Sequence, residues 1–189
     1  MVSFFGLVLR IFAGGSRMAT RSARRAGTLS APPTTGGQAY AEVVWILDGD
    51  TVDVRMEGRK LRIRLYSIDC PEDGQPWGGT AKAGLIKMIG GKSVVLEVHG
   101  VDDYGRTLAT VFARQGRESK LINVNERMVM LGHAWVMRKY SAQLSEERRR
   151  QLNRLEAWAR SKQVGLWGTP SPMPPWKWRR EHGSMGKRG

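Results

Sequence analysis

Apolar and polar residues alternate in short runs through the middle of the chain. The clearest run covers residues 61–65, Leu-Arg-Ile-Arg-Leu, in which every second side chain is apolar. A period of two predicts a strand with one buried face. Comparable short runs that end at Gly, Asp or Pro are predicted as further strands, and they cover residues 43–47, 51–55, 93–98, 107–113 and 133–137.

Three longer segments carry apolar residues at helical spacing, and they cover residues 80–89, 123–131 and 145–162. In the first segment Leu85 and Ile89 share a face, Thr80 is the expected N-cap, and Gly90 is the expected end. Five or six short strands with three helices against them predict an α+β fold that is mainly β. This cadence is typical of an oligonucleotide/oligosaccharide-binding (OB) barrel.

Length and composition narrow the class of protein. A chain of 189 residues is long enough for one folded domain with tails. Its single cysteine, Cys70, excludes an intramolecular disulfide framework and a Cys-rich zinc module. No apolar run reaches the roughly 18 residues that a membrane span needs, so we expect no stable span.

The charge balance indicates a polyanionic partner. Lys and Arg number 31 against 17 Asp and Glu, a net charge of +14. The excess is +5 in residues 1–41, +5 in residues 42–168 and +4 in residues 169–189. Nucleic acid is the first candidate and an anionic membrane surface the second. The membrane surface is the weaker hypothesis, because the two basic ends of the chain show no clear amphipathic helix.

The two ends are expected to lie outside the folded domain. Residues 1–41 contain no acidic residue and suit either a disordered segment or an organellar presequence, and Met18 is a second candidate start. Residues 42–168 form the predicted domain. Residues 169–189 are a Pro-, Trp- and Arg-rich tail whose Trp176 and Trp178 either stack on bases or pack on the barrel. Whether the compartment is a bacterial cytoplasm or lies outside the cell stays open.

Carboxylates and arginines recur at turns and strand ends. Carboxylates are ligands for Ca²⁺ or Mg²⁺, arginines grip phosphate with two parallel hydrogen bonds, and a spare carboxylate can orient or deprotonate water. Together these groups are the components needed to hydrolyse a phosphodiester. They are Asp48, Asp50, Arg64, Asp69, Glu72 and Arg106.

The order and spacing of these motifs resemble a staphylococcal-nuclease (thermonuclease-like) domain. The resemblance covers roughly residues 42–168. It rests on four main stretches, Ile-Leu-Asp-Gly-Asp-Thr at 46–51, Arg-Ile-Arg-Leu-Tyr-Ser-Ile-Asp-Cys-Pro-Glu at 62–72, Asp-Tyr-Gly-Arg at 103–106 and the segment 125–136. It implies a five-stranded OB barrel with three packed helices and a Ca²⁺-dependent phosphodiesterase acting on DNA and RNA, with Mg²⁺ as the alternative cation.

The resemblance also implies roles for individual residues. Asp50 and Asp69 would bind the metal with the backbone carbonyl of Cys70. Asp48 would support these ligands without contacting the metal itself. Glu72 would take the place of the general base or water-orienting group.

The same resemblance assigns the substrate contacts. Arg64 and Arg106 would clamp the phosphate, and Tyr104 and Tyr140 would line the nucleotide site. One departure from the family pattern lies beside them, because Asp103 stands where the family often has a basic residue.

Two classes of function therefore compete. The first is a metal-dependent nuclease, which we expect to be a monomer. The second is a non-catalytic OB module that binds nucleic acid or protein. Three converging carboxylates would repel a phosphate unless a cation were present, which favours the enzyme.

Overall fold

The computed structural model describes residues 38–115 and 120–182. The predicted N-terminal segment therefore lies outside the described residues, apart from residues 38–41, which belong to the first strand. No helix within the described ranges is long and apolar enough to cross a membrane.

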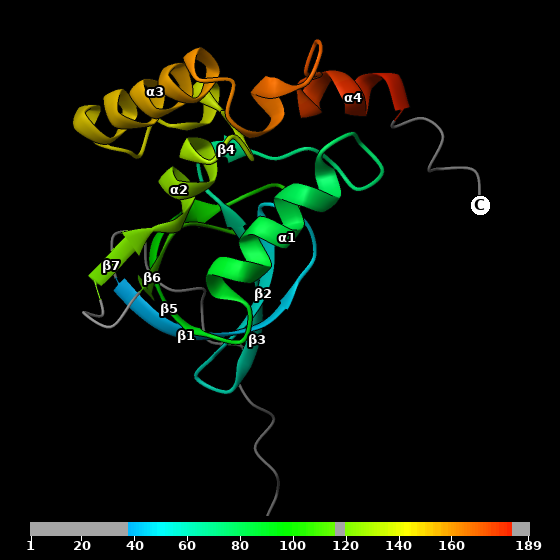
Figure 1. The fold of residues 1–189 in the computed structure, drawn as a ribbon. Coiled ribbons are helices and arrows are strands. Elements are labelled where there is room, and N and C mark those ends of the chain that lie inside the picture. The colour runs from blue at the N-terminus through cyan, green and yellow to red at the C-terminus, as the bar shows by residue number, and fades with distance from the viewer. Residues whose placement is uncertain (1–37, 116–119, 183–189) are drawn as a thin grey trace, which may run out of the picture. The chain divides into compact units, whose positions relative to one another are not determined.

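Five strands close into a barrel (Figure 1). They are β1 (Gln38–Ile46), β2 (Thr51–Met56), β3 (Arg59–Leu65), β5 (Ser93–Val101) and β6 (Thr107–Gln115). The neighbours β3-β2-β1-β5-β6 are antiparallel, and a parallel pairing of β3 with β6 closes the barrel. A short strand, β7 (Lys120–Asn123), extends the sheet beyond β6. The predicted five-stranded OB-type α+β fold is confirmed.

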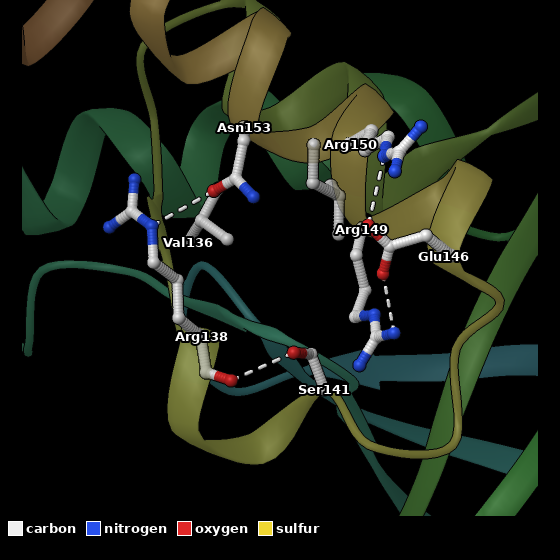
Figure 2. A pocket seen from close by; sticks show the side chains of 8 residues that line it. Val136, Arg138, Ser141, Glu146, Arg149, Arg150 and Asn153 are labelled. Carbon is white, nitrogen blue, oxygen red and sulfur yellow. Dashed lines mark hydrogen bonds and ion pairs between the residues drawn. The ribbon is translucent and has the colours of Figure 1, made fainter.

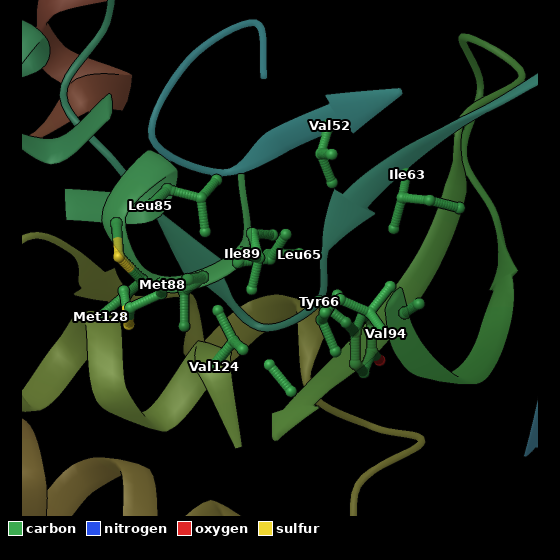
Figure 3. Close-up of a cluster of buried hydrophobic side chains, with 14 of the residues drawn as sticks. Val52, Ile63, Leu65, Tyr66, Leu85, Met88, Ile89, Val94, Val124 and Met128 are labelled. Atoms are coloured by element: carbon green, nitrogen blue, oxygen red, sulfur yellow. The ribbon is translucent and has the colours of Figure 1, made fainter. Parts of the chain in front are cut away.

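The barrel interior is filled by alternate side chains of its strands. Ile63 and Leu65 of β3 are buried, whereas Arg62 and Arg64 leave on the outer face. Figure 3 shows Ile63 and Leu65 among other buried side chains, with Leu85 and Ile89 contributed by the adjoining helix. The strict alternation at residues 61–65 therefore has the predicted cause, one face in the core and one outside.

The three predicted helices are present as α1 (Gly78–Ile89), α2 (Val124–Met130) and α3 (Glu146–Ser161). The N-cap expected at Thr80 is wrong, because α1 begins two residues earlier, after Trp77 in a left-handed conformation (φ 76°). Glycine is required at position 78, because the Cβ of any other residue would collide with the backbone carbonyl of Glu72. The loop that carries Glu72 thus packs directly on the first turn of α1.

A second, two-stranded sheet lies beside the barrel. It pairs β4 (Ile68–Asp69) with β8 (Trp135–Val136), and Asp69 faces Trp135 in the register. The strand expected over residues 133–137 is thus only two residues long, followed by the 3₁₀ helix η1 (Arg138–Tyr140). A second 3₁₀ helix, η2 (Gly165–Gly168), follows α3.

The C-terminal segment forms a fourth helix, α4 (Pro175–His182), that was not predicted. Pro175 is buried, and the ring of Trp176 meets the ring of Trp135 edge-on, with centroids 6.4 Å apart. Just before the helix, the side-chain amide of Gln75 donates a hydrogen bond to the carbonyl of Met173 (2.7 Å). These contacts hold α4 against the part of the molecule that carries β4 and β8.

Candidate active site

Two buried carboxylates meet on one arginine. Arg64 leaves the outer face of β3, and its Nη1 lies 2.9 Å from Oδ2 of Asp50 while its Nη2 lies 2.7 Å from Oδ1 of Asp69. The same guanidinium donates hydrogen bonds to the backbone carbonyls of Leu65 and Ile68. Arg64 therefore fixes both carboxylates and the bend between β3 and β4.

The turn between β1 and β2 aims Asp50 at this arginine. Asp48 Oδ1 accepts a hydrogen bond from the backbone N–H of Asp50 (3.0 Å), and the N–H of Cys70 donates to Asp50 Oδ2 (2.6 Å). A Cβ at Gly49 would lie 2.7 Å from the Cβ of Cys70 and 2.9 Å from that of Ala81. Only glycine allows the turn and the Cys70 loop to approach so closely.

The carboxylates of Asp50 and Asp69 are buried and lie close together on Arg64. Burial raises the pKa of Asp50 to about 8; Arg64 opposes the shift, and the neighbouring charges of Asp48 and Asp69 add to it. Burial also raises the pKa of the Cys70 thiol, so its side chain stays neutral. Such a cluster favours an added positive charge, which would keep its carboxylates ionised.

Arg179 of α4 also reaches this cluster, and sequence reasoning had placed it only among the charges of a tail. Its Nη2 lies 2.8 Å from Asp69 Oδ2, its Nη1 lies 3.2 Å from Asp69 Oδ1, and Nη1 also pairs with Glu72. Burial opposes ionisation of Arg179, but these two carboxylates raise its pKa. Its contacts span more than a hundred residues, so no motif spacing could reveal them.

Glu72 stands at the edge of the cluster on a braced loop. The side-chain carbonyl of Gln75 accepts a hydrogen bond from the backbone N–H of Glu72 (2.9 Å), and the N–H of Gln75 donates to the Glu72 carbonyl (3.0 Å). Gln75 itself is buried. The Glu72 carboxylate is about one-third exposed, so it can meet both Arg179 and solvent.

Arg106 is not joined to the carboxylate cluster in this structure. Its Nε lies 2.7 Å from Oδ2 of Asp102, within the hairpin between β5 and β6. Burial opposes ionisation of Asp102, but hydrogen bonds from Arg106 and the backbone lower its pKa. Arg106 itself lies in the turn, one residue before β6, and in the closing strand pair Leu108 of β6 is opposite Arg64.

The predicted aromatic contacts lie further out. Tyr104 is 85% exposed at the hairpin tip, with the Arg106 guanidinium 5.4 Å from its ring centre. Tyr140 is 55% exposed in η1, where Lys139 lies 5.4 Å from its ring centre. Among the described residues, neither tyrosine side chain interacts with Asp50, Asp69 or Glu72. Both rings are thus exposed to solvent, each with a cation over one face.

A separate hollow of about 280 Å³ opens between η1 and the start of α3 (Figure 2). Its arginines are already paired. Arg149 and Arg150 both bind Glu146 (2.5 and 2.9 Å), and Arg138 binds Asn153 (2.9 Å). The hollow is therefore a surface groove whose arginines already have partners, distinct from the carboxylate cluster.

The chemistry of the donor set fits a hard divalent cation. Carboxylate oxygens are the ligands that Ca²⁺ and Mg²⁺ prefer, and Asp50 and Asp69 present them side by side. Within residues 38–115 and 120–182, however, no three His, Cys, Asp or Glu side chains are grouped to hold a metal by themselves. A cation here would have to complete its shell with backbone carbonyls, water or substrate oxygens.

Comparison with known sequences identifies the family to which this barrel belongs. The family described as "Staphylococcal nuclease homologue" matches residues 62–169. The "Micrococcal nuclease" of Shigella flexneri is 41% identical over 142 residues, covering 74% of this chain and 79% of that protein. The chain therefore belongs to the staphylococcal nuclease family.

Two further relatives match most of the chain. "Protein ParB" of Escherichia coli is 37% identical over 172 residues, covering 89% of this chain and 95% of that protein. An "Uncharacterized endonuclease" of Escherichia coli O157:H7 is 36% identical over 147 residues, covering 78% of this chain and 89% of that protein. The similarity thus extends over nearly the whole of these relatives.

Proposed function

We propose that this protein is a Ca²⁺-dependent nuclease that hydrolyses phosphodiester bonds in DNA and RNA. Nuclease activity in the broad sense is supported by membership of the family and by relatives that are named nucleases. The observation that carries the finer proposal is the pair of buried carboxylates, Asp50 and Asp69, held on Arg64. The net charge of +14 is consistent with a polyanionic substrate. We expect the monomer to be the active form.

Asp50 and Asp69 are the residues proposed to hold the cation, together with the backbone carbonyl of Cys70. Asp48 supports them through its hydrogen bond to the backbone of Asp50. When bound, the cation would supply positive charge for the phosphate and the attacking oxygen. Ca²⁺ tolerates irregular shells of 6–8 oxygens and suits a site with few fixed ligands, whereas Mg²⁺ is the stricter alternative.

The remaining catalytic roles are proposed for Arg64, Arg106 and Glu72. Arg64 binds a non-bridging phosphate oxygen, since its planar guanidinium is already fixed at the carboxylates. Arg106, in the turn that leads into the neighbouring strand β6, neutralises charge on the leaving oxygen. Glu72 accepts a proton from the attacking water, a role supported by its carboxylate being about one-third exposed at the edge of the cluster.

Substrate contacts are proposed on the exposed rings of Tyr104 and Tyr140, because a free aromatic face stacks on nucleobases without regard to sequence. Asp103, exposed beside Tyr104, would repel a terminal phosphate. We therefore propose internal cleavage of long strands over a preference for phosphorylated ends.

Cleavage of labelled DNA and RNA by the full-length protein tests the proposal. We expect cleavage with Ca²⁺, none in excess chelator, and recovery when Ca²⁺ is restored. Asp69→Asn should abolish cleavage, whereas Asp73→Asn, an exposed carboxylate of the same loop, should not.

Two results would contradict the proposal in different ways. Activity that persists in excess chelator would remove the cation from the mechanism. A folded protein that binds nucleic acid but cleaves none under any of these conditions would favour the non-catalytic binding module.

A further inference from the structure

Arg179 binds the carboxylate of Asp69, one of the two residues proposed to hold the cation. Oδ1 of Asp69 accepts hydrogen bonds from Arg64 and Arg179, and Oδ2 accepts one from Arg179. A carboxylate has about four lone-pair sites in all, and three are taken by guanidinium groups. A cation that binds Asp69 must therefore compete with Arg179 for the same oxygens.

The backbone that carries Arg179 is held, whereas its side chain is free to turn. Pro175 is buried and Trp176 contacts Trp135, so the start of α4 is anchored. Gln75 ties Met173, just before α4, to the loop that carries Glu72. Arg179 itself is 45% exposed. A long side chain on a fixed helix can exchange one anionic partner for another nearby without moving the fold.

We propose that Arg179 is a third arginine of the nuclease site, with two successive partners. In the ion-free protein it neutralises Asp69 and Glu72. When a cation displaces it from Asp69, its guanidinium binds a non-bridging oxygen of the nucleic-acid phosphate, since the planar fork matches phosphate as well as carboxylate. This inference rests on the proposed nuclease function and extends it to α4.

The alternative is that Arg179 has only a structural role, holding α4 in place through Asp69. The two roles predict opposite changes in cation affinity. A competitor that is removed leaves Asp69 freer to bind Ca²⁺. A structural brace that is removed leaves Asp69 less well positioned, and Ca²⁺ binding weakens.

The experiment uses full-length Arg179→Gln, with Arg180→Gln as a matched control. Arg180 is the next residue of α4 and is exposed, so its substitution removes the same charge from the same helix. Calorimetric titration with Ca²⁺, without nucleic acid, should give Arg179→Gln a dissociation constant about tenfold lower than that of the native protein. Arg180→Gln should leave it within about twofold.

A second titration measures the phosphate contact. With Ca²⁺ saturating, a nucleoside 3′,5′-bisphosphate should bind Arg179→Gln about tenfold more weakly than the native protein. Arg179→Lys should recover part of this loss, because it keeps the charge but not the fork. Thermal melting of each variant checks that the fold is intact.

Each outcome bears on one statement. Unchanged or weaker Ca²⁺ binding by Arg179→Gln would overturn the competition, and unchanged bisphosphate binding would overturn the phosphate role. If both effects appear but the native protein cleaves neither DNA nor RNA, the nuclease proposal fails and the exchange of partners stands. If the native protein cleaves nucleic acid with Ca²⁺ and both effects are absent, the inference fails alone.

Discussion

Replacing Arg64 with lysine tests the bridge at the centre of the site. The guanidinium contacts two carboxylates at once, 2.9 Å from Asp50 and 2.7 Å from Asp69. An ammonium group is a single point charge and cannot span both. The family resemblance assigned Arg64 only to the phosphate of the substrate. The structure shows it as the counter-ion of two buried carboxylates, so we expect a loss of stability as well.

The size of that loss follows from the burial of the partners. Arg64 is 14% exposed, and the side chains of Asp50 and Asp69 are 7% and 1% exposed. Breaking one buried ion pair costs about 3–5 kcal/mol. Asp69 keeps its ion pair with Arg179, so part of the loss is relieved. We expect the free energy of unfolding to fall by about 2–4 kcal/mol.

Urea unfolding at neutral pH and initial rates of DNA cleavage are the two measurements. Turnover should fall about a hundredfold or more, since a fixed donor to the transition state is lost. The control is Arg62→Lys, two residues earlier on the same face of β3, whose 48% exposed side chain pairs with Asp53. It should cost less than about 1 kcal/mol and leave cleavage unchanged. An Arg64→Lys protein with native stability and native turnover would show that the contacts of Arg64 with Asp50 and Asp69 contribute neither to stability nor to catalysis.

Three further variants test the packing around the site. Asn125→Asp should lower the free energy of unfolding, measured in urea, by about 2–4 kcal/mol. In the native protein the side-chain amide of Asn125 donates to two buried backbone carbonyls, which a carboxylate would repel. Gly49→Ala should cost about 1–3 kcal/mol by the same assay, while Gly79→Ala in α1, with open space around its Cβ, should cost nothing. Hydrogen bonding and charge from Arg62 lower the pKa of Asp53, so its stabilising effect is lost as the pH falls. The melting temperatures of Asp53→Asn and the native protein should therefore converge below about pH 4, and a constant difference from pH 7 to pH 2.5 would contradict this.

The elements that sequence could predict are those whose cause is local. The alternation at residues 61–65 follows from one buried face of β3, and the glycine at position 90 ends α1 as expected. Asp50, Arg64 and Asp69 are close in sequence and lie in a strand meander, so their meeting follows from the fold once the barrel is assumed.

Other features depend on contacts that no local pattern encodes. β4 and β8 are two residues long, too short to show a period, yet they hold Asp69. Arg179 reaches the site because Trp176 packs on Trp135, a contact between residues far apart in the chain that leaves no local pattern. The roles of Arg106, Tyr104 and Tyr140 stay predictions, since in this structure their side chains lie apart from the carboxylates.

The parallel pairing of β3 with β6 affects how the protein gains its activity while folding. This seam joins residues more than forty positions apart, and such long-range pairings form slowly compared with hairpins. Arg64 lies in the seam itself, opposite Leu108. A chain that has built its hairpins but not its seam has no fixed arginine bridge, and so no working site. The appearance of cleavage during refolding would therefore time the closure of the barrel, and a nascent chain would stay inactive until β6 had left the ribosome.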